Sequence, residues 1–317
     1  MVLNRQREVL LRFMAAPTDV ATVGGKIHAG RILEWIDKAA YACAVTWTGS
    51  YCVTAYVGGA SFQRPIETGD VVEVRAAVVY TGRTSLHVRA SVRSGNPRGG
   101  HMSDVTECYI VFVSVTDGGK PQEVPPFVPS SLAELAEKEA AQERISPRAE
   151  IQRAMRAQAY TDAGTAPRTL LRFLAAPTDI NWGGKTHGGT IMRWIDEAAT
   201  LCATTWARKP GLAVYAGGIN FHQAIQIGHV VEVEARIILT GTTSMHVAVH
   251  VRSGAPGAAM QPTLHCHTVV VAMDEHSRPT AVPSWAPSTE EDFRLAEHAA
   301  ELNRLRRPVV GLEAYPS

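Results

Sequence analysis

The sequence has few cysteines and almost no net charge. Its 317 residues include 5 cysteines, and no two of them form a C-x-x-C pair. An odd number of cysteines without metal-ligand spacing is typical of a chain in a reducing compartment. The 31 basic and 30 acidic side chains leave a formal net charge of +1. This balance predicts no nucleic-acid partner, because nucleic-acid binding needs a concentrated basic surface.

Long apolar runs and the commoner catalytic motifs are also missing. No run approaches the roughly 20 apolar residues that a membrane span needs, and the first eight residues lack the apolar core of a signal peptide. We therefore expect a cytoplasmic protein with no membrane partner. There is no G-x-S-x-G elbow, P-loop or H-E-x-x-H motif. His265 and His267 form a possible metal pair, but no third ligand is spaced nearby, so we expect no metal and no cofactor.

The main feature of the sequence is one segment that occurs twice. The motif G-G-K-x-H-x-G-x-I-x-x-W-I-D runs from Gly24 to Asp37 and again from Gly183 to Asp196, 159 residues later. Downstream, Arg93-Ser94-Gly95 recurs as Arg252-Ser253-Gly254 at the same offset. Two long collinear copies indicate a duplicated domain, since a solenoid is built from more and shorter units.

Each copy predicts an α+β unit. Helical spacing of apolar residues predicts one long helix per copy, at about 30–46 and 189–205. A short apolar segment precedes each helix, and two-residue alternation predicts strands after it, in the first copy at about 52–62, 69–80, 84–93 and 104–116. We expect the helix to pack on a curved, mostly antiparallel sheet.

Charged helices are expected after each copy. The resulting division is a first domain at 1–128, a helical linker at 129–160, a second domain at 161–286 and a helical tail at 287–317. Ser130 is expected to cap the linker helix, and Ser288 or Thr289 the tail helix. Pro147 is expected to break the linker helix.

One carboxylate lies in the middle of each apolar helix face, Asp37 in the first copy and Asp196 in the second. Such a carboxylate is costly unless it is partnered or functional. Two interpretations remain open. The carboxylate either accepts structural hydrogen bonds from the backbone or the nearby Lys, or it is a base whose pKa is raised by partial desolvation.

The Gly-rich loop before each helix supplies complementary groups. Gly30 and Gly189 place the backbone close to any ligand at the helix start, where free amides suit an oxyanion. His28 and His187 either polarise a substrate or brace the loop by hydrogen bonding. Bracing is the favoured interpretation, because the Asp is already available for acid–base work.

Together these motifs resemble the double-hotdog acyl-CoA thioesterases, and the cytosolic acyl-CoA hydrolases in particular. The resemblance extends from about Leu10 to Arg307 and includes His187-Gly188-Gly189, Asp196-Glu197 and the Ile219-Asn220-Phe221-His222 segment. It implies that the two copies form tandem hotdog domains that pair as an intramolecular double hotdog. Their sheets would join edge to edge and their helices would lie side by side.

The resemblance also implies two sites, each built by both copies. One would join Asp196 to the loop at 25–30, and the other would join Asp37 to the loop at 184–189. The implied reaction is hydrolysis of acyl-CoA to a fatty acid and CoA, with Asp as general base or nucleophile and helix-start amides at the oxyanion. The implied assembly is a homo-oligomer, a trimer of two-domain chains. The residues expected to contact CoA are Lys26, Lys185, Thr84, Ser85, Thr243, Ser244, Arg93 and Arg252.

The sequence departs from the family pattern at two places. Relatives often have Asn or Asp where this chain has Lys26 and Lys185, and an ammonium group cannot accept a proton from water. Two roles are open for these lysines, pairing with the Asp across the copies or contacting a phosphate. The first loop has Ala29 where the second has Gly188, so the two sites are expected to differ.

Two other functions remain as alternatives. The first is a hotdog protein that binds acyl-CoA without hydrolysing it, as a sensor or assembly subunit. The second is a hotdog dehydratase or hydratase, which would act on an enoyl thioester without releasing CoA. The short spacing from His28 to Asp37 makes the dehydratase less favoured.

Overall fold

The computed structural model describes residues 5–20 and 25–310, with side chains up to Arg306. Gly24 of the repeated motif and the end of the predicted tail, 311–317, lie outside the described residues. Within the described ranges, no helix is long and apolar enough to cross a membrane.

The two copies have the same order of elements. The first consists of β1 (Glu8–Met14), a 3-10 turn (Pro17–Asp19), α1 (Ala29–Thr48), β2 (Cys52–Val57), β3 (Ala60–Ser61), β4 (Val71–Thr81), β5 (Ser85–Gly95) and β6 (Ser103–Ser114). The second consists of β7 (Arg168–Leu174), a 3-10 turn (Pro177–Asp179), α4 (Gly188–Ala207), β8 (Gly211–Phe221), β9 (Val230–Thr240), β10 (Ser244–Gly254) and β11 (Gln261–Ala272). The predicted long helix and the predicted strands of each copy are confirmed.

All the strands join in one antiparallel sheet, in the order β1-β4-β5-β6-β2-β8-β11-β10-β9-β7, with β3 also paired to β8. The copies meet where Tyr56 pairs with Asn220 and Ser61 pairs with Tyr215. The repeat offset converts one pair into the other, because 56 + 159 = 215 and 220 − 159 = 61. The copies are therefore related by a local two-fold axis at the sheet centre, and the predicted edge-to-edge pairing is confirmed.

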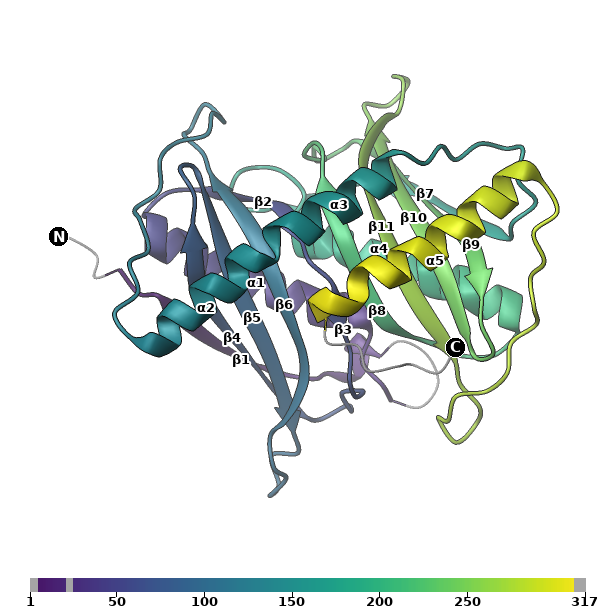
Figure 1. Cartoon of the computed structure of the whole chain (residues 1–317), viewed down its shortest axis with the longest axis horizontal. Helices are drawn as coiled ribbons and strands as arrows, with labels where there is room; N and C mark the ends of the chain where they lie inside the picture. Colours follow the sequence, from purple (N-terminus) through teal and green to yellow (C-terminus); the bar gives the residue numbers. More distant parts are fainter. Residues whose placement is uncertain (1–4, 21–24, 311–317) are drawn as a thin grey trace.

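Helices cover both faces of this sheet (Figure 1). The linker helices α2 (Leu132–Glu143) and α3 (Ile145–Arg156) lie with the tail helix α5 (Glu290–Val310) on the near face in this view, and α1 and α4 lie behind the strands. The inner surface of α1 is made of small and branched apolar side chains that are fully buried. Burial of this stripe is the main force that holds α1 and α4 against the sheet.

The helix caps and the linker break differ in detail from the prediction. Ser131, not Ser130, caps α2, since its hydroxyl accepts a hydrogen bond from the Glu134 amide at 3.2 Å. Ser130 instead donates to the Glu134 carboxylate. Thr289 caps α5 as expected, because its hydroxyl accepts from the Asp292 amide. The linker helix breaks at Arg144 and resumes as α3, with Pro147 in its first turn, where a missing N–H is tolerated.

A β-bulge in β2 determines which side chains face each helix layer. Thr54 is paired with Phe112, yet Tyr56 is paired with Val111, so one extra residue is inserted between them. In a regular strand residues 54 and 56 would point to the same face. The bulge instead directs Thr54 toward α1 and Tyr56 toward α3.

Candidate active site

The long helices α1 and α4 cross closely because each has glycine as its second residue. A Cβ on Gly30 would lie 2.7 Å from the Cα atom of Arg193, and one on Gly189 would lie 2.9 Å from the Cα atom of Glu34. Neither distance is possible for a real side chain, so glycine is required at both positions. The start of each helix therefore lies against the middle of the other, and the predicted side-by-side packing is confirmed.

This crossing brings Asp37 to the loop of the second copy. The Asp37 side chain is almost fully buried. Its Oδ1 accepts a hydrogen bond from the Thr54 hydroxyl at 3.0 Å, and its Oδ2 accepts one from the Gly189 amide at 2.9 Å. Nδ1 of His187 lies 3.2 Å from the same Oδ2. Burial raises the pKa of the Asp37 carboxyl, and His187, Thr54 and Gly189 partly oppose that rise.

The loop that faces Asp37 is held in shape by its own side chains. His187 precedes the first residue of α4, and its Nδ1 accepts a hydrogen bond from the Gly189 amide at 3.1 Å. Asn181 accepts hydrogen bonds from the Gly183 and Lys185 amides at 2.9 and 3.0 Å. These contacts leave the Gly188 amide, at the first position of α4, with no acceptor among the described residues. A free N–H at a helix start is the type of donor that stabilises an oxyanion.

Asp196 occupies the equivalent position but has fewer partners. Its Oδ2 lies 3.3 Å from Nδ1 of His28, whereas its Oδ1 is buried with no hydrogen-bond partner among the described side chains and backbone. Ala213 stands where the first copy has Thr54, and Ala29 stands where the second has Gly188. The expected difference between the two sites is therefore present in their contacts.

Aromatic side chains from both copies stack near the Asp37 site. The ring of Trp182 stacks on the ring of Tyr41 with centroids 4.8 Å apart and planes 3° apart. Tyr41 is one helical turn after Asp37, and Trp182 belongs to the loop of the second copy and is 72% exposed. Both copies therefore contribute an aromatic ring next to the site, just as the first copy contributes the carboxylate and the second the amides.

Sequence reasoning missed Thr54, Asn181 and Trp182. A comparison of the two copies could have indicated Thr54, because the equivalent residue of the second copy is Ala213, which has no hydroxyl. Its contact with Asp37 nevertheless depends on the β-bulge, which the alternation of the strand does not indicate.

Of the two roles left open for the loop lysines, pairing with the carboxylates is not found among the described residues. Lys26 forms an ion pair with Glu67, and Nζ of Lys185 donates to Oε1 of Gln226 at 2.5 Å. Each lysine also forms an isolated β-bridge with the same partner. Contact of these lysines with a phosphate stays a prediction.

The other predicted CoA contacts lie in different places. Thr243 and Ser244 line a cavity of about 590 Å³ together with Ile27 and Ala29 of the opposite loop. Thr84 and Ser85 lie at the start of β5, the equivalent position in the first copy. Arg93 pairs with Asp104 at 3.4 Å and Arg252 with Glu232 at 3.0 Å, and neither arginine lines this cavity. Their contact with CoA stays a prediction.

In the part of the chain that the structure describes, no three His, Cys, Asp or Glu side chains are grouped to hold a metal ion. His267, one of the two histidines considered in the sequence, instead accepts from the Arg306 guanidinium.

The shared sheet, the crossed helices and the carboxylates facing helix-start amides define a tandem hotdog protein. A family model described as "thioesterase superfamily" matches the chain once in each copy, at residues 24–101 and 183–259. A protein of Helicobacter pylori named VdlD is 30% identical over 145 residues, which cover 45% of this chain and 83% of VdlD. The chain belongs to the thioesterase superfamily.

The likeness to one relative covers both copies. The human cytosolic acyl coenzyme A thioester hydrolase is 26% identical over 304 residues, which cover 88% of this chain and 78% of the human protein. Among solved structures, an apo-hexameric acyl-CoA thioesterase is 30% identical, with a TM-score of 0.44, over 47% of this chain and 94% of its own.

Proposed function

We propose that this chain is an acyl-CoA thioesterase that hydrolyses acyl-CoA to a fatty acid and CoA. The observation that carries the proposal is the buried Asp37 carboxylate at the start of α4 of the other copy, where the Gly189 amide donates to Asp37 and the neighbouring Gly188 amide has no acceptor among the described residues. Family membership supports it, as do the names of two relatives, the human cytosolic acyl coenzyme A thioester hydrolase and the rat acetyl-coenzyme A thioesterase. The reaction requires no metal or cofactor, since CoA is part of the substrate.

The proposed mechanism uses Asp37 as a general base. Its carboxylate takes a proton from water while the water oxygen forms a bond to the thioester carbonyl carbon. The carbonyl oxygen becomes an oxyanion beside the Gly188 amide, which has no other acceptor among the described groups. The C–S bond then breaks, and the CoA sulfur leaves with the proton that Asp37 had taken. A raised pKa makes Asp37 a stronger base than an exposed Asp.

We further propose that the Asp37 site accounts for most of the turnover. Oδ1 of Asp37 is held by Thr54, whereas Oδ1 of Asp196 has no described partner. A Cβ on Gly188 would lie 3.2 Å from Oδ2 of Asp37, so the methyl group that Ala29 carries in the other loop narrows the space for water. His187 and His28 act as braces in this proposal.

A thiol-release assay with acyl-CoA of several chain lengths tests the proposed function. We expect release of free CoA with at least one chain length. Binding of CoA without any release would favour the non-catalytic acyl-CoA-binding protein. Hydration of an enoyl-CoA without release of CoA would favour the hydratase.

Thr54→Val is expected to shift the pH dependence of hydrolysis. Burial raises the pKa of Asp37, and the Thr54 hydrogen bond lowers it in part. As a base, Asp37 must be ionised, so kcat/KM falls as pH decreases through this pKa, which lies above the ordinary value of 3.8. Loss of the hydroxyl destabilises the carboxylate, so the acid limb of the profile should move to higher pH, and kcat/KM at neutral pH should fall roughly tenfold.

The profile of kcat/KM against pH, measured for wild type and Thr54→Val, checks this shift. The matched control is Thr46→Val, because the Thr46 hydroxyl donates to a carbonyl within α1 and is not bonded to Asp37. An acid limb that stays in place in Thr54→Val would contradict the role of Asp37 as the titrating base.

A cytoplasmic location and an assembly of three two-domain chains belong to the same proposal. Both follow from the resemblance to cytosolic acyl-CoA hydrolases, and the human relative is itself named cytosolic.

A further inference from the structure

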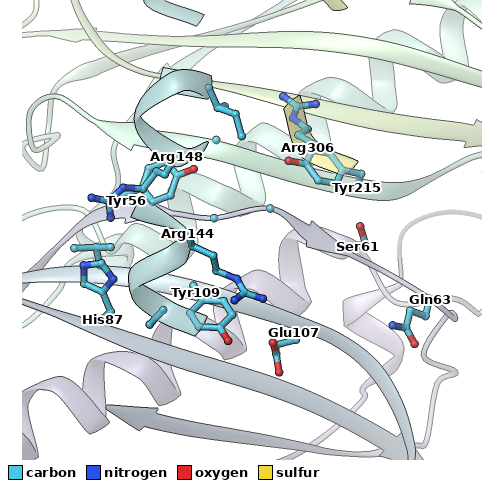
Figure 2. A pocket seen from close by; sticks show the side chains of 16 residues that line it. Tyr56, Ser61, Gln63, His87, Glu107, Tyr109, Arg144, Arg148, Tyr215 and Arg306 are labelled. Atoms are coloured by element: carbon cyan, nitrogen blue, oxygen red, sulfur yellow. The ribbon is translucent and has the colours of Figure 1, made fainter. Parts of the chain in front are cut away.

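A second polar cavity lies on the outer face of the sheet, opposite the layer of α1 and α4. Its volume is about 370 Å³, and it lies between the central strands and the helices α2, α3 and α5 (Figure 2). Tyr56 and Tyr215, which are equivalent in the repeat, both line it. The cavity therefore straddles the boundary between the two copies, and none of the proposed catalytic groups lines it.

Three arginines line this cavity, and each guanidinium stacks over a tyrosine ring. Arg144 lies 4.2 Å from the ring centroid of Tyr109, Arg148 lies 5.2 Å from that of Tyr56, and Arg306 lies 4.7 Å from that of Tyr215. Figure 2 shows Arg144 and Arg148 on one helical segment and Arg306 beside Tyr215. Stacking fixes the orientation of a guanidinium and leaves its N–H groups available in the plane.

The positive charge of these arginines is not compensated. Among the ion pairs of the described residues, none involves Arg144, Arg148 or Arg306. Glu107 is the one acidic residue among the described residues that line the cavity, and its Oε2 lies 3.9 Å from Nε of Arg89. His87 also lines the cavity, but burial and Arg148 lower its pKa to about 4, so it is neutral at neutral pH.

Arg306 is the strongest indication of a missing ligand. Its side chain is only 2% exposed, and its Nη1 donates to His267. Its Nε and Nη2 have no hydrogen-bond partner in the described part of the chain. Burial of an unpaired charge costs free energy. A buried Lys or His can avoid that cost by losing its proton, but a guanidinium cannot. An anion in the cavity would satisfy both the charge and the free donors.

We propose that this cavity binds a diphosphate group. One arginine can donate two parallel hydrogen bonds to two phosphate oxygens. Three arginines offer more donors than a single carboxylate can accept. The cavity is also large enough for two linked phosphoryl groups. This proposal does not depend on hydrolysis at Asp37, because it concerns binding on the other face of the sheet.

Two sources of the diphosphate are compatible with the geometry. One is a nucleoside diphosphate that occupies the cavity alone. The other is the diphosphate of a CoA molecule at the Asp196 side, whose pantetheine would continue into the 590 Å³ cavity that Ala29 lines, because Tyr215 and Arg306 line both spaces. The shared chemistry is the diphosphate, and the two sources differ in what the rest of the ligand contacts.

Isothermal titration calorimetry of the full chain with inorganic pyrophosphate, ADP and CoA tests the proposal. We expect all three to bind to wild type, and the affinity to fall about tenfold or more in Arg148→Gln and in Arg306→Met. The control is Arg153→Gln, an exposed arginine of α3 that does not line the cavity, which should bind as wild type does. Tighter binding of CoA than of ADP would identify the substrate as the source, and equal binding of pyrophosphate and ADP would identify a free diphosphate.

A melting experiment separates a ligand site from a structural role of Arg306. Without ligand, Arg306→Met should melt no lower than wild type, since it removes a buried unpaired charge and keeps an apolar stem of similar length. Pyrophosphate should raise the melting temperature of wild type and not that of the variant. If Arg306→Met fails to fold, Arg148→Gln alone decides the outcome.

Absence of binding of all three ligands to wild type would overturn the proposal. Unchanged affinity in both folded variants would also overturn it. Asp37→Asn should bind pyrophosphate as wild type does, so a failure of the proposed hydrolysis would not be confused with a failure of this site.

Discussion

Asp37→Asn is expected to lower kcat/KM for acyl-CoA hydrolysis by about a thousandfold. The substitution keeps the size of the side chain and removes its ability to take a proton from water. Asp196→Asn is the matched control, because it makes the same change at the equivalent position of the other helix. We expect it to cost less than half of the activity, since Asp196 lacks the Thr54 contact and faces Ala29 in place of Gly188.

The measurement is the rate of CoA thiol release at saturating and subsaturating acyl-CoA. A loss confined to kcat would indicate that Asp37 acts in the chemical step, whereas a rise in KM alone would indicate a role in binding. Equal losses in the two single variants would refute the proposed inequality of the sites. Persistent hydrolysis in the double variant would refute both carboxylates as the base.

The repeat predicted two copies of one α+β domain. The joining of their sheets and the side-by-side packing of their helices were predicted by the resemblance to the double-hotdog acyl-CoA thioesterases and not by the repeat alone. Local periodicity gave the helices and strands because those patterns report burial on one face. The carboxylates of Asp37 and Asp196 were identifiable because each interrupts such an apolar stripe.

The parts that the sequence did not predict depend on contacts between distant elements. Thr54 reaches Asp37 because an inserted residue at Ala55 changes the direction of the strand. The lysines pair with Glu67 and Gln226, residues with which each also forms a β-bridge, and not with the carboxylates. No spacing in the sequence indicates either effect.

The diphosphate cavity also depends on contacts between distant elements that the sequence does not indicate. Arg148 and Arg306 are 158 residues apart, and in the sequence each belongs to a charged helix in which one more arginine is unremarkable. Only the crossing of α3 and α5 over the central strands places them around one cavity. A buried guanidinium without a partner becomes visible only when the surrounding side chains are in place.

Gly30→Ala and Gly189→Ala are each expected to lower the free energy of unfolding by about 1–3 kcal/mol, the usual cost of overpacking. In an exposed helix the same change stabilises by roughly 1 kcal/mol, because Ala has the higher helix propensity. Here the added Cβ would lie 2.7 Å from the Arg193 Cα atom or 2.9 Å from the Glu34 Cα atom. Backbone atoms cannot move aside as a flexible side chain does, so α1 and α4 must separate.

Urea unfolding, with the midpoint and slope compared to wild type, measures this effect. Gly118→Ala is the control, since its Cβ would meet only the Thr116 hydroxyl at 3.8 Å, and its stability should stay within about 0.5 kcal/mol of wild type. Gly189→Ala should also lower hydrolysis, because separation of the helices lengthens the hydrogen bond from the Gly189 amide to Asp37. An increase in stability for either helix variant would mean that the helices do not cross at these glycines, and the composite site would lose its structural basis.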